Sequence, residues 1–149
     1  MINPVEILLV EDDAADVDLL RETMADWHVV ANLHTVEDGV DALAFLHQEG
    51  LYAEVPRPEL IVLDLNLPGI DGRKVLAKIK TDHDLKQIPV VVFTTSQDEE
   101  DIERCYSLGA NCFITKPVGL AEYTRVVKGI EEFWLKIVRL PGQKYRRYS

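Results

Sequence analysis

The chain has 149 residues, 47% of them hydrophobic, and a net charge of −10 at pH 7. This length suits one domain with one hydrophobic core. The acidic balance argues against binding to nucleic acid, which depends on lysine and arginine side chains at the phosphates. The apolar runs are far shorter than the roughly 20 residues of a membrane-spanning helix, and the N-terminus is unlike a signal peptide. We therefore expect a cytoplasmic protein that contacts neither membrane nor nucleic acid.

Short apolar runs alternate with amphipathic stretches five times along the chain. The runs that we predict to be strands are residues 5–10, 32–36, 60–63, 89–93 and 112–115. The stretches with apolar residues at helical spacing are residues 14–27, 39–48, 73–80, 98–108 and 120–138. Strands that are apolar on both faces and separated by helices predict a parallel sheet covered on both sides. Right-handed crossovers then favour a doubly wound α/β fold.

The pattern ends shortly before the C-terminus. Pro141 and Gly142 are expected to stop the last helix, because proline and glycine commonly follow helix ends. The predicted domain therefore covers residues 1–140, and residues 141–149 form a short tail. Every charged side chain from Arg139 on is basic, so the tail is basic although the whole chain is acidic.

Polar side chains follow four of the five predicted strands. In a doubly wound sheet, ligands bind beyond the carboxyl ends of the strands. The residues that stand there are Asp12 and Asp13 after the first strand, Asp64 after the third, Thr94 after the fourth and Lys116 after the fifth. The sequence thus predicts three carboxylates, a hydroxyl and an ammonium group at one edge of the sheet.

Carboxylates that lie close together raise one another's pKa unless a positive charge compensates them. Mg²⁺ is a natural choice, because it prefers oxygen ligands and is often held by one or two carboxylates plus phosphate oxygens. An aspartate beside such a metal is also a reasonable nucleophile toward a phosphoryl group. Lys116 can pair with a phosphoryl oxygen as a point charge, and Thr94 can donate a hydrogen bond to another.

Each of these residues also has an ordinary structural explanation. Asp13 directly precedes a predicted helix, where aspartate is a preferred N-cap. Asp64 could simply begin a turn, Thr94 suits a strand end, and Lys116 could be an exposed lysine. Their joint appearance at four strand ends favours a functional site over these separate explanations.

The motifs resemble the receiver domains of response regulators, from residue 7 to about residue 138. The matching segments are residues 8–13, 63–72, 92–95 and 113–117. A finer similarity links residues 56–58, 93–96 and 131–135 to the stand-alone receivers that partner cyanobacterial phytochrome histidine kinases. The resemblance implies a flavodoxin-like (CheY-like) (βα)5 fold with strand order 2-1-3-4-5.

The resemblance also implies a role for each site residue. Asp64 would accept a phosphoryl group from the phosphohistidine of a sensor histidine kinase. Asp12, Asp13, Asp64 and the backbone carbonyl of Asn66 would hold Mg²⁺. Such a protein is not an enzyme with a separate substrate, but a phosphoacceptor that catalyses its own phosphotransfer and a slow autodephosphorylation.

Three further residues take switching or contact roles by the same resemblance. Thr94 would contact the phosphoryl group and Lys116 would pair with it. The Lys116–Pro117 bond would be cis, which costs only about 1 kcal/mol relative to trans before proline. Phe113 occupies the aromatic switch position that couples to Thr94. Many receivers carry tyrosine there, so a hydrogen bond from its hydroxyl is missing.

Three alternatives remain open at this point. A phosphohydrolase that forms an aspartyl-phosphate would need a second carboxylate as general acid at position 66, which is Asn66 here. A flavin-binding module of the same topology would suffer repulsion between its phosphate and the acidic edge. An interaction module that is never phosphorylated would not need the full set of site residues.

The last predicted helix has more apolar residues than one sheet can cover. The stripe comprises Leu120, Tyr123, Val126, Val127, Ile130, Phe133, Trp134, Ile137 and Val138. The last four are expected near or past the edge of the sheet, where they would form an exposed apolar patch. We predict a homodimer through the face of the fourth helix, fifth strand and fifth helix, with output to an unknown downstream protein. Alternatively, the tail folds back over the patch with Tyr145 and Tyr148.

Overall fold

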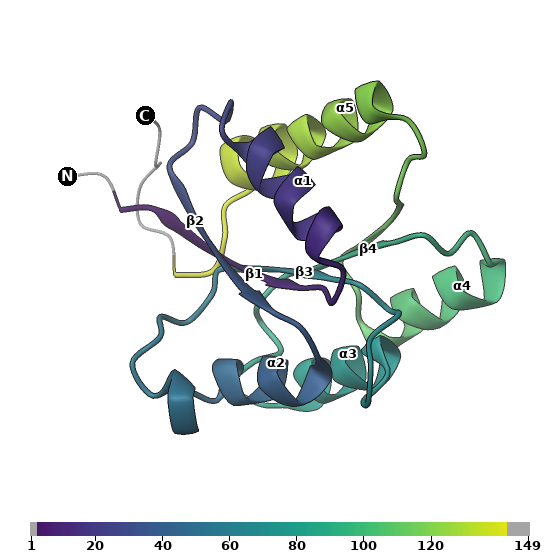
Figure 1. Cartoon of the computed structure of the whole chain (residues 1–149). Helices are drawn as coiled ribbons and strands as arrows, with labels where there is room; N and C mark the ends of the chain where they lie inside the picture. The colour runs from purple at the N-terminus through teal and green to yellow at the C-terminus, as the bar shows by residue number, and fades with distance from the viewer. Residues whose placement is uncertain (1–2, 143–149) are drawn as a thin grey trace.

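The computed structural model describes residues 3–142, which form a single parallel sheet between two layers of helices (Figure 1). The sheet has the order β2-β1-β3-β4-β5. Its strands are β1 (Val5–Val10), β2 (Ala31–Val36), β3 (Leu60–Leu63), β4 (Val90–Thr94) and β5 (Cys112–Thr115). This order confirms the predicted doubly wound fold.

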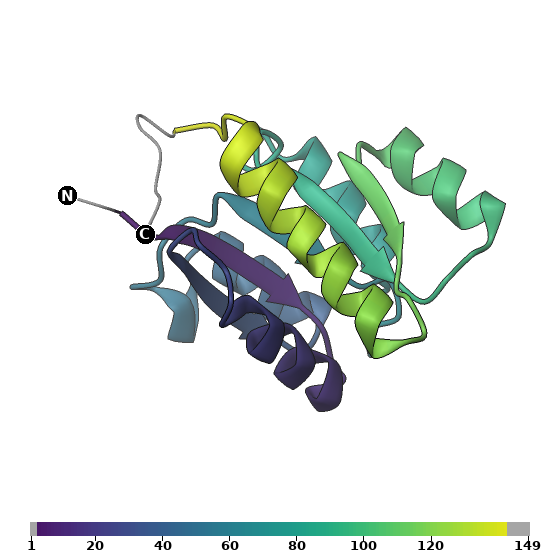
Figure 2. The same ribbon diagram turned by 90° about the horizontal axis from the view of Figure 1, so that it is seen from above.

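The helices divide between the two faces of the sheet. They are α1 (Ala14–Met24), α2 (Gly39–Leu46), α3 (Gly72–Thr81), α4 (Glu99–Leu108) and α5 (Leu120–Ile130). A short 3₁₀ turn, η1 (Gly50–Tyr52), follows α2, and a π-helical segment, η2 (Glu131–Ile137), continues α5. Figure 2 shows α1 and α5 lying across one face, while α2, α3 and α4 cover the other.

Successive side chains on the strands pack alternately into two separate hydrophobic cores, one on each face of the sheet. On β1, Ile7 and Leu9 point toward α1 and α5, whereas Leu8 and Val10 point toward α2 and α3. The same alternation holds along β3 and β4, because successive residues of a strand face opposite sides of a sheet. With both faces buried, the three central strands are nearly continuous apolar runs.

Aspartate side chains fix where four helices begin. Asp13, Asp38, Asp71 and Asp98 are the N-caps of α1, α2, α3 and α4, and each carboxylate accepts a backbone N–H of the first turn. At the other end of α4, Gly109 adopts the left-handed conformation with φ of 108°. The alternation of capped helices and buried strands brings the carboxyl end of each strand to the same edge.

The C-terminal part of the last helix differs from the prediction. The α-helix ends at Ile130 and widens into the π-helical η2, where the N–H of Val138 donates to the carbonyl of Phe133. The wider turn changes which side chains face the core. Trp134 is only 9% exposed and Val138 is half-buried, so the predicted patch of four residues is wrong. Phe133 and Ile137 remain exposed, at 51% and 64%.

The π-helical segment holds a fully buried carboxylate. Glu131 is 0% exposed and accepts the backbone N–H groups of His28 and Val29 at 2.5 and 2.8 Å. Lys128 donates to its other oxygen at 2.6 Å. Burial by itself raises the pKa of Glu131, but Lys128 and the two N–H groups outweigh it and the pKa lies below its ordinary value. The end of α5 is thereby tied to the connection between α1 and β2.

The predicted tail lies mostly outside the described residues. Leu140 is buried in the core beside α5, and Pro141 and Gly142 form a turn. The alternative of a tail folded back with Tyr145 and Tyr148 concerns residues outside the described range. No helix within residues 3–142 is long and apolar enough to cross a membrane.

Gly72, at the start of α3, is required by close backbone packing. A Cβ atom there would overlap the carbonyl oxygen of Asp64 and the Cα atom of Leu65. We expect Gly72→Ala to destabilise the protein by about 1–3 kcal/mol, as overpacking does elsewhere. Thermal unfolding would measure this. Gly129→Ala, where a Cβ meets nothing within 4 Å, is the control and should be neutral or stabilising. Equal melting temperatures for both variants would contradict the prediction.

Candidate functional site

Asp64 lies at the centre of the carboxyl edge of the sheet. It follows β3, which pairs with β1 on one side and with β4 on the other. Its backbone N–H donates to the carbonyl of Val10 at 3.0 Å, so the ladder with β1 continues as far as this residue. The residue is 6% exposed. The prediction that the strand ends converge around Asp64 therefore agrees with the structure.

Three groups hold the carboxylate of Asp64. The hydroxyl of Thr94 donates to Oδ1 at 2.8 Å, and the backbone N–H of Asn66 donates to the same oxygen at 3.2 Å. Lys116 Nζ donates to Oδ2 at 3.2 Å. Burial by itself raises the pKa of Asp64, but the charge of Lys116 and these hydrogen bonds outweigh it and the pKa lies below its ordinary value. The side chain is thus a carboxylate at neutral pH.

Lys116 is the cation that balances the site. Its side chain is 8% exposed, and Nζ lies 2.5 Å from Glu11 Oε1, 2.9 Å from Asp16 Oδ2 and 3.2 Å from Asp64 Oδ2. Burial lowers the pKa of Lys116, but hydrogen bonds to Glu11 and Asp16 and the neighbouring negative charges raise it above the ordinary value. The ammonium group therefore stays charged although it is buried.

Glu11, Asp12 and Asp64 form a group that suits a divalent cation. One carboxylate oxygen from each lies within 4.8 Å of the others. Burial raises the pKa of Glu11 above its ordinary value, and Lys116 offsets this only in part. A cluster with unbalanced negative charge and only oxygen donors fits Mg²⁺ or Mn²⁺ better than a softer metal. The acidic site predicted from the sequence is therefore present, with one change in its members.

The change concerns Asp13, which is not part of this group. Its carboxylate accepts the N–H groups of Ala15 and Asp16 at 2.9 and 3.3 Å and so caps α1. Glu11, which directly precedes the predicted pair Asp12 and Asp13, lies in the acidic group instead. The capping role, which the sequence offered as the structural alternative for Asp13, is the one that the structure shows. Asn66 is exposed beside Asp64, and its carbonyl stays a predicted ligand.

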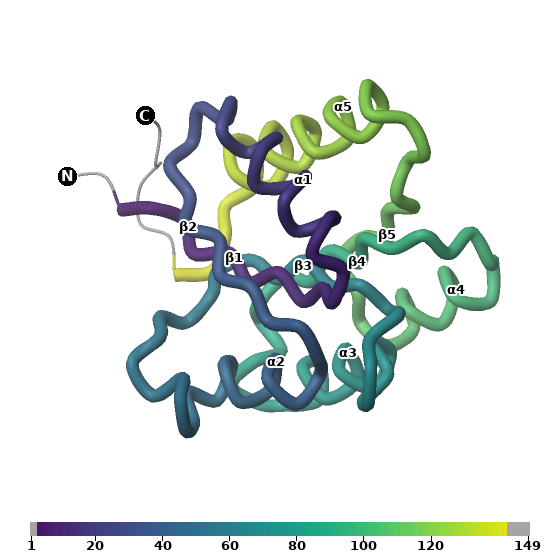
Figure 3. Tube along the Cα trace, in the orientation of Figure 1, coloured from purple at the N-terminus to yellow at the C-terminus, as the bar shows by residue number. Residues whose placement is uncertain are grey.

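Of the two residues predicted to switch, Thr94 bonds directly to Asp64, whereas Phe113 lies on β5 opposite Val92 of β4. Thr94 is 0% exposed, and Phe113 on β5 is half-buried against the core under α2, α3 and α4. The hydroxyl of Tyr106 on α4 accepts the backbone N–H of Phe113 at 3.1 Å. The chain then leaves β5 and continues through Lys116 to α5 (Figure 3). On the side of β5, the site is therefore connected to α4 through the hydrogen bond between Phe113 and Tyr106, and to α5 through the chain after Lys116.

The predicted cis bond between Lys116 and Pro117 is wrong. No peptide bond within residues 3–142 is cis. The backbone N–H of Lys116 donates to the carbonyl of Thr94 at 2.6 Å and extends the pairing of β4 with β5. With this trans bond, Lys116 Nζ lies within hydrogen-bonding distance of Glu11 and Asp64.

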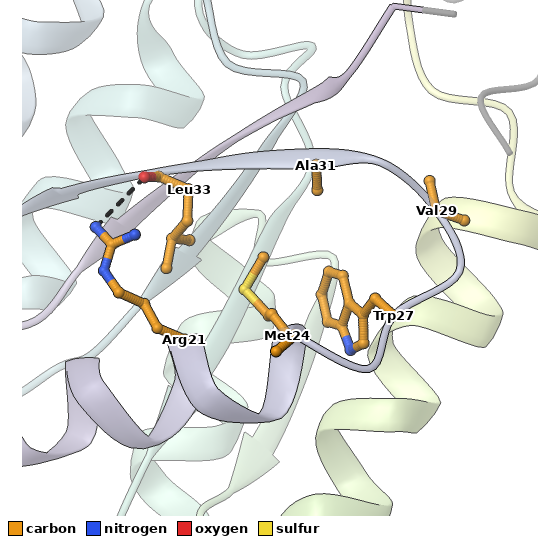
Figure 4. Close-up of a pocket in the computed structure, with 7 residues that line it drawn as sticks. Arg21, Met24, Trp27, Val29, Ala31 and Leu33 are labelled. Carbon is orange, nitrogen blue, oxygen red and sulfur yellow. Dashed lines mark hydrogen bonds between the residues drawn. The ribbon is translucent and has the colours of Figure 1, made fainter. Parts of the chain in front are cut away.

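A separate pocket between α1 and β2 does not belong to this site (Figure 4). It has a volume of about 230 Å³ and is lined mainly by apolar side chains, including Met24, Trp27 and Leu33. Its one charged side chain is Arg21, whose Nη2 reaches the carbonyl of Leu33 at 3.5 Å. None of the lining side chains within residues 3–142 is a carboxylate, so this pocket lacks the charged oxygen ligands of the site around Asp64.

The sequence pattern of the response regulator receiver domain matches residues 7–128. The chain belongs to the response regulator receiver family. It is 51% identical to the response regulator Rcp1 of Synechocystis sp. over 139 residues, which cover 93% of this chain and 95% of Rcp1. The fold and the resemblance to receivers are thereby confirmed.

Two solved structures of response regulators are similar over nearly the whole chain. The crystal structure of the Mn²⁺-bound form of Rcp1 has a TM-score of 0.90 at 50% identity, over 93% of this chain and 100% of that one. The crystal structure of the phosphorylated cyanobacterial phytochrome response regulator RcpA has a TM-score of 0.90 at 52% identity, over 94% and 100%. The finer resemblance to the receivers of cyanobacterial phytochromes is therefore also confirmed.

The geometry separates the roles of two neighbouring acidic residues. We expect Glu11→Gln to weaken Mg²⁺ binding roughly tenfold or more, because affinity depends on the charge of the ligands. Asp13→Asn should leave the Mg²⁺ affinity and the stability nearly unchanged, since asparagine and aspartate cap helices about equally well. Calorimetric titration with Mg²⁺ and a melting curve for each variant would measure both. A large loss of affinity in Asp13→Asn would return that residue to the metal site.

Proposed function

We propose that this receiver accepts a phosphoryl group on Asp64 from a sensor histidine kinase of the phytochrome type and signals through protein contacts. The observation that carries the proposal is the environment of Asp64. It is a buried, ionised carboxylate bonded to Thr94 and Lys116 and adjacent to two further carboxylates. The similarity to the phosphorylated RcpA and to Rcp1 supports the phytochrome assignment.

Mg²⁺ is the proposed cofactor. The carboxylates of Glu11, Asp12 and Asp64, with the backbone carbonyl of Asn66, would hold it. When bound, the ion supplies positive charge that screens the carboxylate from an incoming anionic donor. The all-oxygen donor set and the Mn²⁺-bound form of Rcp1 support this part of the proposal.

The transfer step follows from the groups around Asp64. One carboxylate oxygen of Asp64 attacks the phosphorus of the kinase phosphohistidine, and a P–O bond forms as the P–N bond breaks. The imidazole nitrogen keeps the electron pair of the broken bond. Lys116 donates to a phosphoryl oxygen, and the hydroxyl of Thr94 turns from Asp64 toward another. Later attack by water on phosphorus breaks the bond to Asp64 and releases phosphate, so the protein resets itself without acting on a separate substrate.

Thr94 and Phe113 are the proposed switch. Because the Thr94 hydroxyl now bonds to Asp64, its rotation toward a phosphoryl oxygen removes that hydrogen bond. The side chain of Phe113 then repacks beside it, and this changes the surface that α4, β5 and α5 offer to partners. The hydrogen bond from the Phe113 N–H to Tyr106 links this movement to α4.

Substitution of Asp64 tests the proposed function. Asp64→Asn keeps the shape and removes the nucleophile, so labelling by a phosphorylated histidine kinase should vanish. Chelation of Mg²⁺ should abolish labelling of the wild type in the same assay. Acid-stable but alkali-labile label in the variant would show that another side chain accepts the phosphoryl group and would refute the assignment.

We also propose that the receiver forms a homodimer through α4, β5 and α5. The exposed apolar side chains Phe133 and Ile137 continue the surface of α5, and Tyr106 is 49% exposed on α4. Exposed apolar patches of this kind mark interaction surfaces, and twofold pairing is the commonest way to cover them.

Sedimentation of a double variant tests this part of the proposal. The wild type at micromolar concentration should run as a dimer, and Phe133→Ala with Ile137→Ala should run as a monomer whose circular dichroism shows that it is still folded. Leu51→Ala, which removes an apolar side chain that is 97% exposed on η1, is the matched control. A monomeric wild type, both with and without phosphorylation, would rule out the dimer.

A further inference from the structure

The ammonium group of Lys116 is shared among three carboxylates. An ammonium group has three N–H donors, and Glu11, Asp16 and Asp64 each accept one in this structure. Glu11 and Asp64 also belong to the group that would hold the metal, whereas Asp16 does not. Of these three partners of Lys116, Asp16 is therefore the one whose carboxylate is not also expected to bind the metal.

This difference matters when the site is in use. Metal binding draws on the oxygens of Glu11 and Asp64, and a phosphoryl group on Asp64 requires a donor from Lys116. Both changes weaken the hold of these two carboxylates on the lysine. Its four-carbon stem is flexible, so an ammonium group without a fixed partner would lose its direction. Neither change draws on the carboxylate of Asp16, which lies outside the group that would hold the metal.

The position of Asp16 is itself fixed by the start of α1. Asp16 stands in the first turn, and its N–H donates to the Asp13 carboxylate that caps the helix. Its side chain is 35% exposed and reaches across to the end of β5, 100 residues further along the chain. The cap at Asp13 thus orients Asp16, and Asp16 orients Lys116.

We propose that Asp16 is a positioning residue that keeps Lys116 aimed at Asp64 during phosphoryl transfer. This inference rests on the proposed function of Asp64. Asp16 contacts neither the metal group nor the reacting atoms, and it acts only through the lysine. The alternative is that Asp16 merely stabilises the N-terminus of α1 through the helix dipole, as any acidic residue in the first turn does.

The test is phosphorylation by acetyl phosphate at increasing Mg²⁺ concentration, followed by intact-protein mass spectrometry. Asp16→Asn should lower the rate at saturating Mg²⁺ roughly tenfold, because small misplacements of a positioned group are costly. The Mg²⁺ concentration at half-maximal rate should stay unchanged. Asp16→Glu, which keeps the charge, should recover part of the rate. Asp18→Asn, which removes an exposed carboxylate of α1 outside the site, should behave as wild type.

The outcomes separate this inference from the proposed function. A wild type that is phosphorylated while Asp16→Asn reacts equally fast would overturn the inference alone. An equal loss in Asp18→Asn, or a shift in the Mg²⁺ dependence with an unchanged maximal rate, would do the same. A wild type that takes up no phosphoryl group, or an Asp64→Asn variant that still does, would overturn the proposed function and this inference with it.

Discussion

The carboxyl edge of the sheet concentrates negative charge around one buried lysine. Glu11, Asp16 and Asp64 all lie within hydrogen-bonding distance of Lys116, and Asp12 stands beside them. Buried charges are tolerated only when they are paired, because water no longer stabilises them. Lys116 satisfies this requirement in part, and the remaining negative charge leaves room for a second cation. The charge balance that keeps the edge stable is thus the one that prepares it to receive a phosphoryl group.

The rest of the fold serves to hold that edge rigid. Two cores, one on each face, pack the central strands so closely that their side chains are almost completely buried. The ends of β1, β3 and β4 therefore keep a fixed relation to one another. Close packing continues into the loops, since Gly72 leaves no space for a side chain against the backbone of Asp64. Interiors of this density resist continuous deformation, so a change at the site shifts whole elements.

Much of this arrangement could be predicted from the sequence, and the reasons are local. Apolar strands with helices between them admit few topologies, and the residues after the strands must meet at one edge. The structure brings Asp64, Thr94 and Lys116 together at that edge, as predicted. It also brings Glu11 into the acidic group, where Asp13 was expected, because strand-end position alone does not tell which side chain points inward and which one caps the helix. The path of the backbone after Val10, where β1 ends, determines which of these side chains faces Asp64.

The end of the last helix shows a different limit of sequence reasoning. The apolar spacing of residues 120–138 fits a regular helix, but the structure changes to a wider turn at Glu131. The stability of that turn comes from the N–H groups of His28 and Val29, which lie about a hundred residues earlier. The spacing of apolar residues along one helix cannot predict a hydrogen bond to such a distant segment. Exposure of Trp134 was predicted for the same reason, although the π turn places it in the core.

The buried carboxylate of Glu131 gives α5 two unequal ends. At its C-terminal end, outward movement would break the hydrogen bonds from the backbone N–H groups of His28 and Val29 to the buried carboxylate of Glu131, which costs free energy. At its N-terminal end, α5 follows Lys116 through the exposed residues Val118 and Gly119, and Gly119 caps the helix without a side chain. A displacement of Lys116 would therefore tilt α5 about its C-terminal end, where Glu131 is held. The N-terminal end of α5, which follows Lys116, would move the most.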